Sequence, residues 1–380
     1  MIFKVIDTEH IPIKIWMDDL EQGALQQAKN AANLPYAFRH IAIMPDAHAG
    51  YGVPIGSVLA TREIVVPNAV GVDIGCGMCA ARLNTKIPEQ KSLSKIVREI
   101  KKKVPVGFAW HKKPQEWEGF DRAPDVDIIN ENLEKATYQI GTLGGGNHFI
   151  EIQKGNDNRL WVMVHCGSRN FGLKIANHYH RRAKSLCESR SDVPARDLSF
   201  LPLGPGKEGD EYLEAMNFAI AFAKANRDQI MKLILEVFDC ESSGYINIHH
   251  NYAARETHFG THVIVHRKGA TKAAKGEKGI IPGSQGSKSY IVEGLGNPES
   301  FHSCSHGAGR VMGRKQAIRS LSLREEIEKM DRKGILHSMR TGKDLDEAES
   351  AYRNIDQVMQ NQSDLVKVLV ELVPLAVIKG

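Results

Sequence analysis

His306 lies in the segment Ser303-Cys304-Ser305-His306-Gly307-Ala308-Gly309-Arg310, whose residue types suit covalent chemistry on a nucleotide. An imidazole nitrogen can attack a phosphorus centre and leave again, and an arginine can bind phosphate oxygens through two N–H groups. The small residues after the histidine let the backbone approach a nucleotide closely. The alternative is a loop histidine that precedes a basic helix, because glycines commonly stand before helices.

Five further side chains are of the types that bind divalent cations, and they are Asp73, Cys76, His148, His165 and His250. Asp73 and Cys76 lie three residues apart in a glycine-rich turn, and each histidine lies at one end of an apolar run. Five mixed donors exceed one tetrahedral zinc site, and a thiolate can bridge two ions. The pattern therefore predicts two adjacent cations that share Cys76, and carboxylate with imidazole suits manganese as well as zinc.

Some of these residues have other interpretations. The Cys76–Cys79 spacing also occurs in zinc ribbons, and the surrounding glycines also suit a tight turn with a buried free thiol. Asp46 is expected to orient a metal-ligating histidine, although an aspartate also closes turns. His258 and His262 are four residues apart, but the glycine between them argues against a helix that would align them as ligands.

Composition limits the class of protein. The chain has 380 residues, of which 42% are hydrophobic, and 50 basic against 45 acidic residues give a net charge of +5, which is compatible with a polyanionic partner. Early charged residues exclude a signal peptide, and no apolar stretch is long enough to span a membrane. The six scattered cysteines are no disulfide framework. These features predict a cytoplasmic protein without a membrane partner.

Alternating short strands and helices predict an α+β fold. Strands are expected at residues 41–44, 57–60, 64–66, 78–83, 138–140, 148–152, 161–165, 245–250 and 261–266, and helices at 91–103, 211–237, 310–332 and 344–372. Residues 107–127 are interpreted as a surface excursion, and the glycines at 144–146 as a hairpin or close-approach loop. No linker separates the candidate metal-binding and catalytic residues, so one domain over residues 1–380 is expected.

Four segments together resemble the RtcB family of RNA ligases. They are residues 70–78, residues 146–151, residues 282–284 with Ser289-Tyr290, and residues 305–310. The resemblance runs from Met44 to the terminal Gly380. It implies a single composite domain with central β-sheets flanked by helices and an active site in a cleft at the strand ends.

The resemblance also implies an activity. Family members join RNA 3′-phosphate or 2′,3′-cyclic phosphate ends to 5′-hydroxyl ends, in RNA repair or tRNA splicing. They use GTP and two Mn²⁺ ions, a guanylylated histidine and an RNA-3′-pp-5′-G intermediate. RNA is then the substrate, an activating protein is a possible partner, and a monomer is expected. A metal-dependent phosphoesterase acting on RNA ends and a non-catalytic RNA-end-binding protein are the alternatives.

Residue by residue, His306 matches the nucleophile of the family and Cys76 the bridging ligand. Asp73 and His148 would bind one ion, and His165 and His250 the other. Arg169 and Arg310 are candidates for the RNA phosphate. The nucleotide pocket would draw on Asn147, His148, Phe149, Ile150, Glu151, His250, Asn251, Pro282, Gly283, Ser284, Gln285, Ser289, His306, Gly307, Ala308, Gly309 and Lys379.

The chain also departs from the family pattern. Cys166 follows His165 where a serine is familiar, three consecutive glycines stand at 144–146, and the chain is short for the family. These departures indicate a divergent bacterial branch, for which a damaged RNA is the expected substrate.

Overall fold

Strands and helices alternate along the whole chain in the computed structural model, which describes residues 1–380. The strands are β1 (Lys4–Ile6), β2 (Ile13–Ile15), β3 (Ala37–His48), β4 (Ile55–Thr61), β5 (Ile64–Val65), β6 (Gly77–Leu83), β7 (Phe149–Gly155), β8 (Leu160–Cys166), β9 (Leu201–Pro202), β10 (Ser242–His249), β11 (Asn251–His258), β12 (Thr261–Lys268), β13 (Ala270–Lys272), β14 (Lys278–Ile281), β15 (Ser289–Gly294), β16 (Ser303–Ser305) and β17 (Val366–Lys379). The α-helices are α1 (Gln22–Ala32), α2 (Gln90–Lys103), α3 (Asp127–Gln139), α4 (Arg169–Leu186), α5 (Glu208–Phe238), α6 (Arg314–Ser320), α7 (Leu323–Arg332) and α8 (Ile355–Asn361). Short 3-10 helices are η1 (Pro67–Ala69), η2 (Glu118–Arg122), η3 (Arg196–Leu198), η4 (Pro298–Ser300), η5 (Gly342–Glu347) and η6 (Glu349–Ala351).

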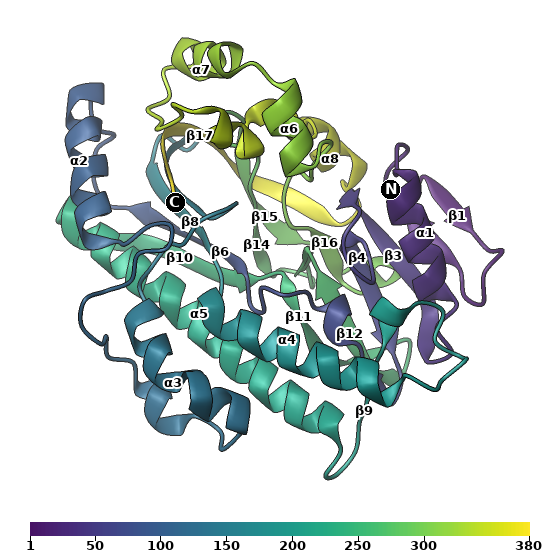
Figure 1. The fold of residues 1–380 in the computed structure, drawn as a ribbon. Helices are drawn as coiled ribbons and strands as arrows, with labels where there is room; N and C mark the ends of the chain where they lie inside the picture. The colour runs from purple at the N-terminus through teal and green to yellow at the C-terminus, as the bar shows by residue number, and fades with distance from the viewer.

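Two large β-sheets form the centre of the molecule (Figure 1). One has the strand order β1-β2-β3-β4-β12-β11, and the other has the order β10-β6-β8-β7-β17-β15-β14. Apolar side chains of β3, β4 and β12 meet those of β14 and β15 in one core cluster, which joins the two sheets. The predicted α+β class, with central sheets flanked by helices, is confirmed.

The long helix α5 covers one face of the seven-stranded sheet. Its Ile230, Met231 and Ile234 pack with apolar residues of β6, β7 and β8, whose inward-facing side chains alternate along each strand. Figure 1 shows α4 beside α5 on this side of the molecule and α6, α7 and α8 on the opposite side. None of the helices is both long and apolar enough to cross a membrane.

Several predicted elements are wrong. The helix expected at 344–372 is instead η5, η6, α8 and the strand β17, which pairs with β7 and β15. Pro374 is accommodated in β17 where the register with β7 shifts. The strand expected at 138–140 falls in and after the last turn of α3, and the helix expected at 310–332 begins at Arg314 and is interrupted before α7.

The glycines at 144–146 form a close-approach loop between α3 and β7. Gly144 has a φ of +80°, and a Cβ there would lie 1.9 Å from the Arg169 guanidinium. A side chain is therefore disfavoured by the backbone conformation, and it would also require the Arg169 guanidinium to move. A hairpin is not formed, because α3 and not a strand precedes the loop.

A buried arginine of α5 holds two chain segments together below the strand ends. Arg227 is fully buried, and its Nη1 donates to the carbonyls of Gly75 at 2.9 Å and Cys166 at 2.8 Å. Its Nε donates to Asn247 at 2.8 Å. Since Gly75 precedes Cys76, this side chain fixes the turn that carries Cys76 against the end of β8.

Replacing this arginine should destabilise the protein strongly. Arg227→Ala leaves buried carbonyls without donors, so we expect the free energy of unfolding in urea to fall by about 3 kcal/mol. Arg324→Ala is the control, because Arg324 is 88% exposed in its pair with Glu328 and should change stability by less than about 0.5 kcal/mol. Equal urea midpoints for the two variants would contradict the role of Arg227.

Candidate functional site

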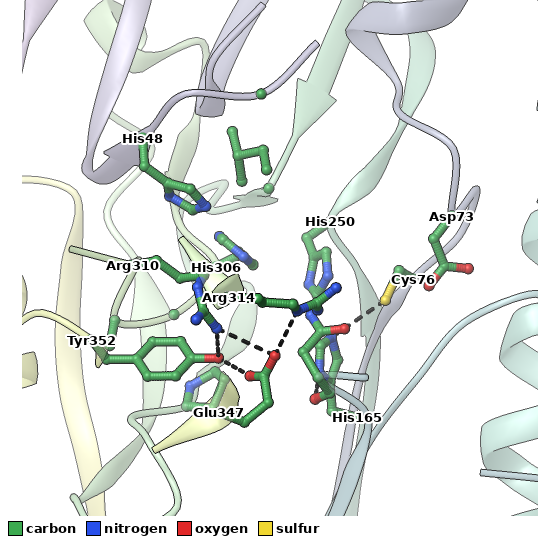
Figure 2. Close-up of a pocket in the computed structure, with 18 of the residues that line it drawn as sticks. His48, Asp73, Cys76, His165, His250, His306, Arg310, Arg314, Glu347 and Tyr352 are labelled. Atoms are coloured by element: carbon green, nitrogen blue, oxygen red, sulfur yellow. Dashed lines mark hydrogen bonds and ion pairs between the residues drawn. The ribbon is translucent and has the colours of Figure 1, made fainter. Parts of the chain in front are cut away.

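A cavity of about 850 Å³ lies where the ends of strands from both sheets meet. His250 stands between β10 of one sheet and β11 of the other, so it lies where the chain passes between the sheets. Figure 2 shows Cys76, His165 and His250 on one side of the cavity and Glu347 and Tyr352 on the other. A cavity of this size is typical of a small-molecule or cofactor site.

The structure brings the five predicted metal donors together: four of them, Asp73, Cys76, His165 and His250, line this cavity, and His148 lies beside Cys76 and Asp73 without lining it. The Sγ of Cys76 lies 3.5 Å from Nε2 of His148 and 3.3 Å from Nε2 of His165. The Nε2 of His148 is also 3.1 Å from a carboxylate oxygen of Asp73. Two groups of donor atoms, each within 4.8 Å, share Cys76: Asp73, Cys76 and His148 form one, and Cys76, His165 and His250 the other.

Backbone carbonyls orient two of these imidazoles. The Nδ1 of His148 lies 3.0 Å from the carbonyl of Leu143, and the Nδ1 of His165 lies 3.0 Å from the carbonyl of Asn147. A carbonyl only accepts, so in each ring Nδ1 carries a proton and Nε2 faces the Cys76 sulfur, where it would offer its lone pair to a bound cation. The buried Nδ1 of His250 has no hydrogen-bond partner. This unpaired nitrogen is consistent with a ring that serves as a ligand.

When no cation is bound, burial also affects the pKa values of the metal-binding side chains. It raises the pKa of the Cys76 thiol to about 12. Burial also opposes ionisation of Asp73, but the hydrogen bond and charge of His148 prevail and lower the pKa of this carboxyl to about 2. A cation in the shared position would provide the charge that makes a buried thiolate favourable.

Asp46 contacts His306 and not one of the metal-binding histidines. Asp46 is fully buried, and one of its oxygens accepts the backbone N–H groups of His306 at 3.1 Å and Gly307 at 3.2 Å. The same oxygen lies 2.6 Å from Nδ1 of His306. Nε2 is therefore the free nitrogen of the ring, which lies 4.8 Å from the His250 ring. Asp46 thus supports His306, whereas the sequence pattern predicted support for a metal ligand.

Most residues expected in the nucleotide pocket line the cavity. They are Asn147, Phe149, Glu151, His250, Asn251, Pro282, Gly283, Ser284, Gln285, His306, Gly307, Ala308, Gly309 and Lys379. Ile150 lies in the core below β7, because side chains alternate along a strand. Ser289 lies behind the wall, where its Oγ accepts hydrogen bonds from Gln153 and from the backbone of Gly283, each at 3.2 Å.

Two buried charged groups of the pocket face each other across β7 and β17. Burial raises the pKa of Glu151 to about 8, although the nearby Lys379 and a hydrogen bond from Gln153 act in the opposite direction. Burial likewise lowers the pKa of Lys379. At neutral pH the Glu151 carboxyl is therefore mostly protonated, and this wall combines it with the Lys379 amine group in a water-poor environment.

The two arginines predicted for RNA phosphate differ in position. Arg310 lines the cavity, and its Nη1 lies 3.2 Å from Glu347 and 3.1 Å from the Tyr352 hydroxyl. Arg169 lies outside the cavity lining, with Nη1 3.1 Å from Nδ1 of His148. Since that nitrogen already donates to Leu143, the Arg169 contact is no hydrogen bond, and its guanidinium keeps donors free for an anion.

Several cavity residues are absent from the sequence-based set. They are Lys268, Arg314, Glu347 and Tyr352. Burial lowers the pKa of Lys268 to about 8, and its ammonium donates to the Asn68 carbonyl at 3.0 Å. Glu347 also pairs with Nε of Arg314 at 3.0 Å. No local motif marks these residues; only Arg314 has a sequence signal, since it follows the His306 segment in a basic run.

The remaining candidates lie apart from the cavity. Cys79 is buried in the core on β6, so the zinc-ribbon pairing with Cys76 is not formed. His258 and His262 lie on the two strands of the β11–β12 hairpin, and no helix aligns them. His258 pairs instead with Glu256 at 2.8 Å.

Asp46→Ala tests the anchoring of the His306 loop. The change leaves two buried N–H groups without an acceptor, so we expect the free energy of unfolding to fall by about 2 kcal/mol. In ¹⁵N-histidine NMR spectra, His306 should change from a single tautomer protonated at Nδ1 to a mixture. The control is Asp192→Ala, whose carboxylate is 41% exposed in its pair with Arg190. An unchanged His306 tautomer would refute the anchoring.

Comparison with known proteins agrees with this geometry. The family model described as tRNA-splicing ligase RtcB matches residues 27–125 and 116–380. The RNA-splicing ligase RtcB of Escherichia coli strain K12 is 38% identical over 413 residues, covering 100% of both chains. The tRNA-splicing ligase RtcB of Nanoarchaeum equitans is 32% identical over 462 residues, covering 98% of this chain and 96% of its own length. The chain therefore belongs to the RtcB family.

Proposed function

We propose that this chain is an RNA ligase that joins a 3′-phosphate or 2′,3′-cyclic phosphate end to a 5′-hydroxyl end at the expense of GTP. The observation that carries the proposal is the common cavity of His306 and the shared-sulfur donor groups. Relatives named RNA-splicing and tRNA-splicing ligases over their full length support it. A nucleophile beside a paired metal site suits transfer of a nucleotidyl group.

The donor set fits two divalent cations, and we propose Mn²⁺ for both. Asp73 and His148 would hold one cation, His165 and His250 the other, and Cys76 would belong to both groups. The unpaired Nδ1 of His250 and the orientation of the other two imidazoles support this assignment. Bound cations would neutralise phosphate charge and align the reacting oxygens.

His306 is the proposed nucleophile, and each step has a defined bond exchange. Nε2 attacks the α-phosphorus of GTP, an N–P bond forms, the bond to the β-phosphate breaks, and pyrophosphate leaves. An oxygen of the RNA 3′-phosphate then attacks the same phosphorus, the N–P bond breaks, and the imidazole is restored. The 5′-hydroxyl oxygen finally attacks the RNA-borne phosphorus, loses its proton and displaces GMP. A cyclic end is first hydrolysed to a 3′-phosphate.

The chain's own residues would bind and orient both substrates. Asp46 keeps the His306 ring in place with Nε2 free. Guanine presents N–H donors beside its O6 acceptor, and these donors would favour the ionised form of Glu151, so that Glu151 and Lys379 offer a complementary pair. Arg310 and Arg169 are the proposed contacts for the RNA phosphate, because guanidinium binds phosphate oxygens bidentately.

His306→Ala tests the covalent step. With radiolabelled GTP and Mn²⁺ the native protein should acquire an acid-labile, alkali-resistant label, and the variant should lose labelling and joining by at least about 10³-fold. His262→Ala, an exposed histidine on β12, should behave like the native chain. A label that persists in His306→Ala would contradict the assignment.

The same assay separates the alternative functions. Hydrolysis of a 2′,3′-cyclic phosphate by metal-loaded native protein, without labelling or joining, would indicate a phosphoesterase. RNA binding without any of these reactions would indicate a non-catalytic RNA-end-binding protein. Both outcomes would reject the ligase.

If Cys76 binds both cations, its removal should affect both, whereas removal of His250 should affect only one. Cys76→Ala should weaken binding of both cations by more than about 100-fold, since even partners of metal ligands cost 10–100-fold when removed. His250→Ala should weaken one cation and retain the other. Equilibrium dialysis against Mn²⁺ with elemental analysis measures both, and Cys240→Ala, a partly exposed thiol, is the control. Loss of only one cation from Cys76→Ala would contradict the shared role.

A further inference from the structure

We propose that Phe108 and Trp110 form a stacking platform for the bases of single-stranded RNA next to the ends that are joined. The inference rests on the proposed function for its substrate, because the polynucleotide is the one implied by RNA-end joining. It assigns a role to the loop after α2, which contributes no residue to the cavity lining.

The two aromatic side chains are exposed without an intramolecular partner. Phe108 is 104% exposed and Trp110 44% exposed, and neither takes part in an aromatic pair. Trp117 in the same excursion packs against Phe120, with ring centroids 5.1 Å apart, and against Phe222 of α5. The excursion therefore packs two of its four aromatic residues, Trp117 and Phe120, against Phe222 and presents Phe108 and Trp110 to solvent, where a base can stack on them.

Backbone hydrogen bonds hold the loop in place on both sides of the aromatic residues. Before them, the N–H of Gly107 donates to the carbonyl of Gly144 at 2.9 Å, and the N–H of Leu143 donates to Pro105 at 2.9 Å. After them, the N–H of His111 donates to Tyr138 at 3.0 Å. The platform is thus attached to α3 and to the glycine loop that leads into Asn147 and His148.

A backbone contact connects the loop of the platform to the chain terminus beside the cavity. Gly107 packs on the C-terminal residue, since a Cβ on Gly380 would lie 3.0 Å from the backbone nitrogen of Gly107. The neighbouring residue Lys379 lines the cavity. An RNA whose end reaches the cavity would therefore pass close to this loop.

The charge around the platform favours a polyanion. Lys112 and Lys113 come two and three residues after Trp110, are exposed and form no ion pair. By contrast, Lys102 and Lys103 on α2 are each 2.8 Å from a glutamate. Free lysines beside exposed aromatic rings are the combination that binds single-stranded nucleic acid without reading its sequence.

The test is the binding of a 3′-phosphorylated single-stranded RNA oligonucleotide by fluorescence anisotropy. Removal of both rings in Phe108→Ala/Trp110→Ala should weaken binding at least about 10-fold, because stacking on one base contributes 1–3 kcal/mol. The aromatic variant Phe108→Tyr/Trp110→Phe should retain most of the affinity, and Phe108→Leu/Trp110→Leu should not. An oligonucleotide with abasic positions should bind the native chain and the alanine variant alike.

Phe3→Ala is the matched control. Phe3 is 53% exposed and lies beside β1, which is an edge strand of the six-stranded sheet and does not contact the loop of Phe108. Native affinity of the double alanine variant for RNA would overturn the platform, and a role of this loop in binding a protein partner would then be the remaining interpretation. Guanylylation of His306 needs no RNA and should be unchanged in the variant. If the native chain shows neither guanylylation nor joining while RNA binding still depends on the rings, the proposed function fails and the platform stands.

Discussion

The position of one sulfur atom determines how the strand ends must be arranged. Cys76 precedes β6, and its Sγ lies within hydrogen-bonding distance of imidazoles that come from β8 and from the segment before β7. A third imidazole, His250, completes the second donor group from the junction of the two sheets. The order β10-β6-β8-β7 places these strands side by side. The site is thus a consequence of sheet topology more than of any local motif.

Buried polar groups stabilise this arrangement where apolar packing cannot. Arg227 donates to two carbonyls at the base of the Cys76 turn, and Asp46 accepts two N–H groups at the start of the His306 loop. Each group would be costly to bury without its partners. Because the partners belong to segments far apart in the sequence, these hydrogen bonds connect the Cys76 turn and the His306 loop to the centre of the fold.

The metal-binding residues could be found from the sequence, but the charged residues that complete the cavity around them could not. Histidines at strand ends and a cysteine among glycines identify the donor set without knowledge of the fold. Glu347 and Lys268 have no such signal, because their place in the cavity depends on η5 meeting Arg310 and Arg314, more than 30 positions away, and on β12 meeting Asn68, 200 positions away. Helix α4 is absent from the elements expected from sequence, although Phe171 and Ile175 recur at the spacing of a helical face.

The C-terminal strand shows why local patterns fail for apolar segments. Residues of β17 such as Val370 and Leu372 fit a helix as well as a strand when considered alone, and pairing with β7 and β15 decides between the two. The error matters for function, because β17 brings Lys379 to the cavity and Gly380 to the loop of Phe108. Contacts between distant segments therefore complete a site whose most reactive residues are recognisable locally.

Diffraction from crystals grown with Mn²⁺ and a non-hydrolysable GTP analogue, measured at the manganese absorption edge, tests the central claim most directly. The account predicts two anomalous peaks on either side of the Cys76 sulfur, with the α-phosphorus facing Nε2 of His306. A single peak without Cys76 as a ligand, or a nucleotide bound away from His306, would contradict it.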